Sequence, residues 1–358
     1  MEPEMKNEQK VAKTVRLGLK IFAALAVVVS ATFGFAEKTT GENMAEAATD
    51  FLNALTPDQK KKASFSFQDP ERIRWHFIPL QDKERNSTRK GLRLEEMNES
   101  QKKSALALLQ VGTSKEGYNR ARQIMGLESY LKESEKKSGA MVRNQEWYFV
   151  TVFGEPGNDK SWGWRFEGHH MSLNFTLEGT TVTSATPSFF GANPAEIKEG
   201  PKKGLRTIPE TDLLARKLIA SLSTEQKKEA GSEKHFDEIE QAKAIGKSFP
   251  KGITIEKLSE DQKALVKELI SGYSLRFPKN LAEKELARLL GKDFSRLDFS
   301  FSQELAKTNQ PITYRLQGPD LLIEFLNIQA DGNGIPANHI HSSWRAANGD
   351  FGIRPSRK

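Results

Sequence analysis

Two of the six histidines lie two residues apart, in the stretch Asn338-His339-Ile340-His341-Ser342-Ser343-Trp344-Arg345. The stretch is typical of a β-strand, in which successive side chains point to opposite faces. On such a strand His339 and His341 present two imidazoles on one face, while Ile340 points to the other. A second pair, His169-His170, lies far upstream. Whether these two distant histidine-bearing segments lie together depends on the fold.

The composition is that of a globular protein with a packed core. The chain has 358 residues, of which 37% are hydrophobic, and it contains 21 phenylalanines and 5 tryptophans. It has no cysteine, which excludes disulfides, thiolate metal ligands and a cysteine nucleophile. Any metal site must therefore use nitrogen and oxygen ligands.

The net charge of +7 is mild for a chain of this length. Lysines are interspersed with glutamates along amphipathic stretches. The sequence has neither an arginine-rich run nor a basic stripe with interleaved aromatic residues, which are the patterns of nucleic-acid binding. We therefore expect no nucleic-acid partner; the pattern does not fix an oligomeric state.

The N-terminus has the pattern of an export signal. Basic residues precede an apolar run over residues 21–35, and the small residues Gly34 and Ala36 suit cleavage after Ala36. The run is shorter than the roughly 20 residues of a membrane span. We predict a signal peptide over residues 1–36, an exported (periplasmic or secreted) protein, and membrane contact only through this signal.

Four segments share the signature of a helix start, in which a cap residue is followed three positions later by glutamine. The cap side chain accepts a hydrogen bond from the third helical amide, and glutamine reaches back to the cap. The four pairs are Thr56/Gln59, Asn98/Gln101, Ser223/Gln226 and Ser259/Gln262. They form two similarly spaced sets, each followed by strands and then by histidines, which predicts an internal duplication.

Within each half, helices precede strands, which favours an α+β fold with mainly antiparallel strands. Residues 191–209 contain three glycines and three prolines, a composition typical of a linker. We predict an N-terminal half over residues 37–190, a linker over 191–209 and a C-terminal half over 210–358, packed as one unit. Strands are expected at residues 73–78, 147–153, 162–166, 170–176, 312–317, 321–326 and 339–344.

Alternation along these strands selects candidate ligands. His170 shares a strand face with Ser172 and Asn174, whereas His76 lies opposite the apolar set that includes Trp75. These faces predict a cluster of imidazoles if the two halves pack together.

Glu324 is a lone carboxylate in an otherwise apolar strand. A buried carboxylate needs a partner, because an uncompensated charge is expensive to desolvate. That partner is either a metal cation or an arginine such as Arg315 or Arg345.

We predict a metal site between the two halves, with ligands drawn from His76, His170, His339 and His341. Three imidazoles suit zinc, two imidazoles with the carboxylate of Glu324 suit iron, and copper also fits an all-imidazole site. A divalent ion would activate water or a substrate oxygen, which favours a metal-dependent enzyme, hydrolytic or oxidative. Further candidates are Glu324, Arg345 and Asp350 for catalysis, and Trp75, Ser172, Asn174 and Trp344 for substrate contact.

The same residue types fit two other classes of protein. A cleft lined by histidine, tryptophan and arginine suits a non-catalytic exported protein that binds a small molecule or a carbohydrate. A packed polar seam suits a structural envelope protein. Histidines clustered in one open cleft would favour an enzyme or a binding protein, with a small-molecule or glycan-like substrate as the expected partner.

Distinctive segments extend over the chain from about residue 51 to residue 352: Arg74-Trp75-His76-Phe77, Trp162-Gly163-Trp164-Arg165-Phe166, Gly168-His169-His170-Met171-Ser172-Leu173-Asn174, Phe189-Phe190-Gly191-Ala192, Gly318-Pro319, Ile323-Glu324-Phe325, Asn338-His339-Ile340-His341, Trp344-Arg345 and Asp350-Phe351-Gly352. Together they resemble the DUF3500 family of uncharacterised proteins, which are mostly bacterial and often exported. The resemblance implies membership without an established activity. Members often continue past the Asp-Phe-Gly element into a segment with another histidine, whereas this sequence ends at Lys358.

Overall fold

The computed structural model describes residues 38–135, 141–158, 160–241, 249–291, 294–302 and 310–353. The chain divides into two compact units, Met1–Lys38 and Thr39–Lys358, and every element below belongs to the second. The predicted signal peptide lies outside the described residues. In the ranges just given, no helix is both long enough and apolar enough to cross a membrane.

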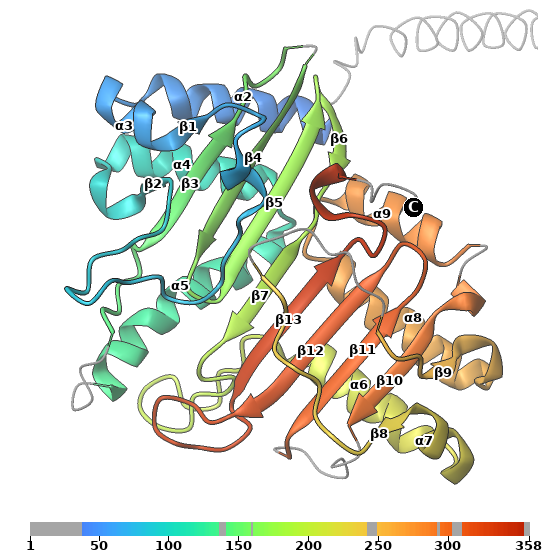
Figure 1. Ribbon diagram of the computed structural model, residues 1–358. Coiled ribbons are helices and arrows are strands. Elements are labelled where there is room, and N and C mark those ends of the chain that lie inside the picture. Colours follow the sequence, from blue (N-terminus) through green and yellow to red (C-terminus); the bar gives the residue numbers. More distant parts are fainter. Residues whose placement is uncertain are drawn as a thin grey trace, which may run out of the picture. The chain divides into compact units, whose positions relative to one another are not determined.

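In the first half of the second unit, two helices and two short strands precede two further helices and then the longer strands (Figure 1). Its helices are α2 (Thr40–Asn53), α3 (Pro57–Ala63), α4 (Glu99–Val111) and α5 (Lys115–Ser134). Its strands are β1 (Ser64–Phe65), β2 (Leu92–Arg93), β3 (Tyr148–Phe153), β4 (Ser161–Gly168), β5 (Met171–Glu178), β6 (Thr181–Ser184) and β7 (Ser188–Ala192).

The second half follows the same order of helices and strands. Its helices are α6 (Pro209–Ser221), α7 (Thr224–Ala230), α8 (Glu260–Ser274) and α9 (Lys279–Leu289). Its strands are β8 (Gly231–Ser232), β9 (Ile253–Thr254), β10 (Asp298–Ser302), β11 (Ile312–Gln317), β12 (Leu322–Gln329) and β13 (His339–Arg345).

The thirteen strands of the described residues form one sheet, whose main path is β1-β3-β4-β5-β7-β13-β12-β11-β10-β8. The short strands β2, β6 and β9 pair with β3, β5 and β10, respectively. The ladders are antiparallel, except that β1 pairs in parallel with β3 and β8 with β10. The predicted α+β class with mainly antiparallel strands is therefore confirmed.

The two halves meet where β7 pairs with β13. This antiparallel ladder aligns Ile340 with Ala192, His341 with Gly191 and Trp344 with Ser188. Gly191 and Ala192, at the start of the predicted linker, thus belong to the strand that joins the halves.

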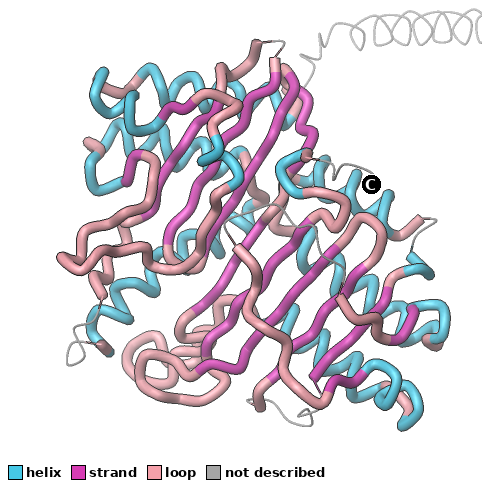
Figure 2. The backbone as a smooth tube through the Cα atoms, in the orientation of Figure 1, coloured by secondary structure: helices cyan, strands magenta, loops and turns pink. Residues whose placement is uncertain are grey.

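The helices cover one face of the sheet, because alternate strand positions carry large apolar side chains. Leu173 and Phe175 on β5, and Ile340 and Trp344 on β13, pack into the same core as the helices. The opposite face is crossed by two loops, which Figure 2 shows as pink tubes in front of the strands. We name them the first covering segment (residues 66–91) and the second covering segment (residues 233–241). A smaller apolar cluster lies on this face, made of Trp75, Phe77, Phe189, Ile239, Leu326 and Phe351.

All four predicted capping boxes are present, at Thr56, Asn98, Ser223 and Ser259. Their glutamines also bond to each other, which periodicity alone does not predict. In the first half the amides of Gln59 and Gln101 exchange hydrogen bonds of 3.1 and 2.8 Å. The Gln101 amide also donates to the carbonyl of Ala54, five residues before Gln59. This amide pair ties the start of α3 to the start of α4.

The second half repeats these contacts. Gln226 and Gln262 exchange amide hydrogen bonds of 3.0 and 2.9 Å, and Gln262 donates to the carbonyl of Ser221, again five residues before its partner glutamine. The starts of α7 and α8 are therefore joined in the same way as those of α3 and α4.

The predicted strand over residues 73–78 is wrong. A 3-10 helix, η1 (Pro70–Ile73), precedes an extended stretch that pairs with no strand among the described residues. Arginine side chains donate to backbone carbonyls of η1 and of this stretch instead. Arg165 donates to the carbonyls of Glu71 and Arg74, and Arg89 donates to that of His76. Side chains thus satisfy the polar backbone groups that a ladder would otherwise satisfy.

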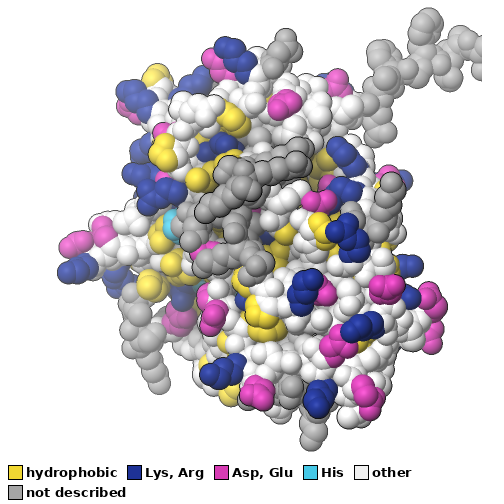
Figure 3. Space-filling view, turned by 45° about the vertical axis from the view of Figure 1, so that its right-hand side comes forward, with side chains coloured by type: hydrophobic (Ala, Val, Ile, Leu, Met, Phe, Trp, Pro, Cys, Tyr) yellow, Lys and Arg dark blue, Asp and Glu magenta, His cyan; other side chains and the backbone are white. Residues whose placement is uncertain are grey.

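Charged side chains of both signs are interspersed over the face shown in Figure 3. This agrees with the mild net charge of +7.

Replacing Gln101 by alanine should lower the free energy of unfolding by about 2 kcal/mol, because the change removes the capping bond and the hydrogen bonds that the buried Gln101 amide donates to Gln59 and Ala54. Gln262→Ala should have a similar effect, since Gln262 makes equivalent contacts. Urea unfolding followed by circular dichroism measures both values. Gln110→Ala, at an exposed position of α4, is the control and should change stability by less than about 0.5 kcal/mol. Equal effects of Gln101→Ala and Gln110→Ala would contradict a stabilising amide pair.

Candidate metal centre

His339 and His341 are positioned by β13, as the predicted alternation requires. Ile340, between them, is buried in the helix-covered core, so both imidazoles lie on the opposite face. His341 is 6% exposed and His339 is half-buried.

His170 is positioned by a turn and not by a strand, so the strand predicted over 170–176 begins one residue too early. β5 starts at Met171, and His170 has a φ of 61°, in the left-handed region that few residues other than glycine adopt. Two backbone bonds hold this conformation: the amide of His170 donates to the carbonyl of Phe77, and its carbonyl accepts from the amide of Gly191, both at 2.8 Å. The first covering segment and β7 therefore fix the ring together.

Gly191 allows the imidazoles of His170 and His341 to meet, although β5 and β13 are not neighbours in the sheet. β7 lies between β5 and β13, and strands are spaced about 4.8 Å apart, so the rings of His170 and His341 have to approach each other over β7. Gly191 is the β7 residue paired with His341. A Cβ atom at Gly191 would lie 2.7 Å from the carbonyl oxygen of Ile340 and 3.0 Å from Cδ2 of His170. Only glycine fits without movement of the backbone or the ring.

The three imidazoles converge through their Nε2 atoms. The Nε2 of His170 lies 2.8 Å from that of His339 and 3.3 Å from that of His341. All three candidate ligand atoms lie within 4.8 Å of one another. Tetrahedral zinc with Zn–N bonds of 2.0–2.1 Å separates its nitrogen ligands by about 3.3 Å. The two distances from Nε2 of His170 lie within about 0.5 Å of this spacing, so the three side chains could hold one metal ion.

Hydrogen bonds at the other ring nitrogens set the tautomers. The Nδ1 of His341 lies 2.8 Å from a carboxylate oxygen of Glu238 and donates to it. The ring of His339 bonds to the backbone of Ala330, and since its Nε2 faces His170, that bond uses Nδ1. With hydrogen on both Nδ1 atoms, the Nε2 atoms of His339 and His341 carry lone pairs.

Burial holds His170 and His339 in the neutral form. Burial is the largest cause that lowers the pKa of His339, to about 2, and the nearby His341 adds to the effect. Burial likewise places the pKa of His170 well below its ordinary value, reinforced by His169 and His339. Neutral imidazole is the form that binds metal.

His76 does not belong to this group. Its backbone amide donates to Glu167, and burial lowers the pKa of its ring. Among the described residues, the group that could hold a metal ion consists of the other three of the four predicted ligands.

Glu324 is partnered by an arginine, one of the two alternatives for this residue. Its Oε1 lies 3.4 Å from Nε of Arg315, and Ser343 donates to its other oxygen. Burial raises the pKa of Glu324, against the opposing charges of Arg345 and Arg315. Glu324 therefore belongs to a buried ion pair and is not part of the imidazole group.

The remaining predicted residues are all buried. Arg345 and Asp350 form a fully buried ion pair with an Nη2–Oδ2 distance of 2.7 Å. Trp344 lies in the helix-side core, and Trp75 lies in the small cluster on the other face. Ser172 and Asn174 belong to a second polar group, in which Ser172 donates to Glu167 and Asn174 donates to Ser172.

Two carboxylates beside the site were not predicted. Glu238, from the second covering segment, contacts His341, and Glu128, from α5, contacts Nδ1 of His169. The ring of His169 stacks on that of His170 at a centroid distance of 3.8 Å. Both carboxylates lie in segments rich in charged residues, and no spacing in the sequence links them to a histidine.

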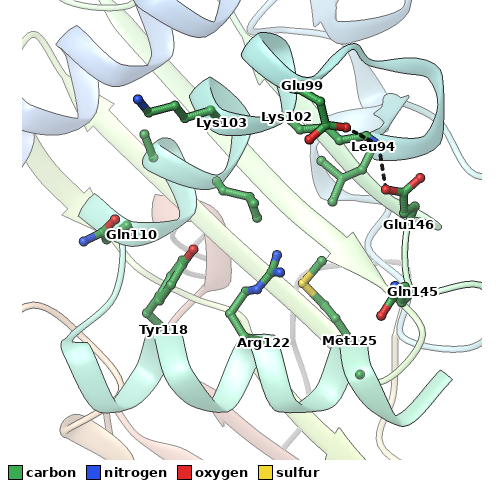
Figure 4. A pocket seen from close by; sticks show the side chains of 13 residues that line it. Leu94, Glu99, Lys102, Lys103, Gln110, Tyr118, Arg122, Met125, Gln145 and Glu146 are labelled. Atoms are coloured by element: carbon green, nitrogen blue, oxygen red, sulfur yellow. Dashed lines mark hydrogen bonds and ion pairs between the residues drawn. The ribbon is translucent and has the colours of Figure 1, made fainter. Parts of the chain in front are cut away.

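A separate groove lies between α4 and α5 (Figure 4). Tyr118, Arg122 and Met125 line it from α5, and Lys102, which pairs with Glu146, lines it from α4. None of the imidazoles described above lines this groove.

Gly191→Ala should lower the free energy of unfolding by about 2 kcal/mol, because the added methyl group overpacks the contact with Ile340 and His170. Urea unfolding measures the change. The matched control is Gly126→Ala in α5, where a Cβ meets nothing within 4 Å and the higher helix propensity of alanine should raise stability by up to about 1 kcal/mol. A stable Gly191→Ala protein would mean that the contact between β7 and His170 is loose.

Comparison with known proteins places the chain in a family. The model of the family described as "Protein of unknown function (DUF3500)" matches residues 37–353, nearly the whole chain. A search of curated proteins and a search of solved structures both found no match. The resemblance predicted from the sequence is therefore confirmed, and the chain belongs to the DUF3500 family.

Proposed function

We propose that this protein binds one divalent metal ion through the Nε2 atoms of His170, His339 and His341 and is a metal-dependent enzyme. The observation that carries the proposal is the convergence of these three atoms, two of which present lone pairs to the third. A proton on Nε2 of His170 can satisfy only one of these lone pairs. A cation at the shared point satisfies all three nitrogens at once.

The ligands favour zinc or copper over iron. All three are imidazoles, which suit zinc with one open position and also suit copper. An iron site of two imidazoles and one carboxylate has less support, because Glu324 is paired with Arg315.

An ion held by three protein ligands keeps a position for water or a substrate oxygen, which it would activate. Zinc would support hydrolysis and copper an oxidative reaction. The half-buried His339 offers the most accessible side of the group, which suits a small molecule or the end of a glycan. Export after cleavage near Ala36 is part of the same proposal and is supported by the apolar run over residues 21–35.

A structural ion is the second candidate. His170 and His341 are only 3% and 6% exposed, and the three ligands come from both halves of the sheet. An ion there would tie the halves together without turnover. This reading predicts slow metal exchange and no metal-dependent activity, whereas a catalytic ion keeps a ligand position open to solvent.

We also propose that the two halves arose by internal duplication. The order of helices and strands, the parallel pairs β1–β3 and β8–β10, and the two glutamine pairs support this origin. Superposition of the halves in an experimental structure tests it. Gln59 and Gln101 should fall on Gln226 and Gln262, and strand paths that diverge after α4 and α8 would contradict it.

Metal analysis of the purified protein tests the metal site. We expect one zinc or copper ion per chain, and none after dialysis against a chelator. Because the ion binds only the folded state, a concentration 1,000-fold above its Kd should raise the free energy of unfolding by about 4 kcal/mol.

His170→Ala, His339→Ala and His341→Ala should each abolish stoichiometric binding and this stabilisation. His235→Ala, at a histidine outside the group, is the control and should bind metal like the wild type. A wild-type protein that holds no more metal than the His339→Ala/His341→Ala double variant would refute the proposal.

A further inference from the structure

The second covering segment is fixed over the sheet at three points. The amide of Phe236 donates to the hydroxyl of Thr313 at 3.1 Å. Ile239 is buried in the small apolar cluster. The carbonyl of Glu240 accepts a 2.8 Å bond from Arg345, whose guanidinium is fully buried. The residues on either side of Glu238 are therefore anchored.

Glu238 uses both carboxylate oxygens. One accepts from Nδ1 of His341 at 2.8 Å and from the side-chain amide of Gln329 at 3.0 Å. The other accepts from the amide of Ile239 at 2.8 Å. A carboxylate acceptor is thus held against the ring from a fixed direction.

The two hydrogen-bonded imidazoles of β13 have acceptors of different charge. His339 bonds to a neutral backbone carbonyl, whereas His341 bonds to a carboxylate. In the described part of the chain, Glu238 is the carboxylate that contacts one of the three converging imidazoles. The three imidazoles therefore have one carboxylate next to them.

We propose that Glu238 is a positioning residue that makes the three-imidazole group competent to bind metal, by fixing the hydrogen of His341 on Nδ1 and aiming its Nε2 lone pair at the shared point. This inference rests on the proposed metal site and adds a residue from outside the ligand set. A carboxylate that accepts from a ligating imidazole orients the ring and makes it a better donor. Its charge also offsets part of the positive charge that an ion brings into a buried site.

Cobalt and zinc titrations of the metal-free, full-length protein test this role. Glu238→Ala should weaken zinc affinity 10- to 100-fold, the usual effect of losing such a partner. Glu238→Gln should weaken it less, because the amide oxygen still accepts from Nδ1 without the charge. Asp237→Asn removes the same charge from the adjacent exposed position and should bind like the wild type.

The visible spectrum of bound cobalt provides a readout that simple destabilisation does not change. The ligand-field bands should shift in Glu238→Ala and move back toward the wild-type position in Glu238→Gln. Thermal melting of the metal-free variants checks that they fold, and Glu238→Gln keeps the comparison possible if the alanine variant does not.

The outcomes separate the two proposals. If wild-type protein binds neither cobalt nor zinc, the metal site itself fails and this inference fails with it. If wild-type protein binds metal and both Glu238 variants match its affinity and cobalt spectrum, the inference alone is overturned.

Discussion

The ladder between β7 and β13 is the interaction on which the rest of the structure depends. It joins the strands of both halves into one sheet, and it sets His341 opposite Gly191. Without this pairing β7 and β13 would each be an edge strand with a row of free backbone groups. The same ladder brings imidazoles 169 residues apart in sequence within hydrogen-bonding distance. Sheet continuity and the candidate metal centre thus share one set of contacts.

The sheet face opposite the helices differs from the helix-covered face because it buries charged side chains. It carries charged side chains that are nearly inaccessible, such as Arg165, Glu167 and Arg345, and buried charges require partners. Arginines on the strands obtain them partly from carbonyls of the two covering segments. These bonds hold irregular backbone over the sheet, and they place Phe77 against His170 and Glu238 against His341. The polar face therefore positions the groups that surround the imidazoles.

Patterns within about ten residues predicted much of the fold. The capping boxes at Thr56, Asn98, Ser223 and Ser259 lie where expected, because a cap depends only on its own helix turn. Alternation placed His339 and His341 on one face for the same local reason. The strand expected over residues 73–78 failed, because its alternation reflects packing of a loop and arginine side chains replace its ladder.

The amino-acid sequence by itself determined the α+β class, the helix starts, the family and the shared face of two histidines. Only the tertiary structure decided that His170 joins them while His76 does not, that Glu324 pairs with Arg315, and that Glu238 contacts His341. The physical reason is the distance along the sequence over which each feature is determined. Caps and alternation are set by neighbouring residues, whereas convergence of ring nitrogens depends on which strand is inserted between two others and on a glycine that leaves room for the rings.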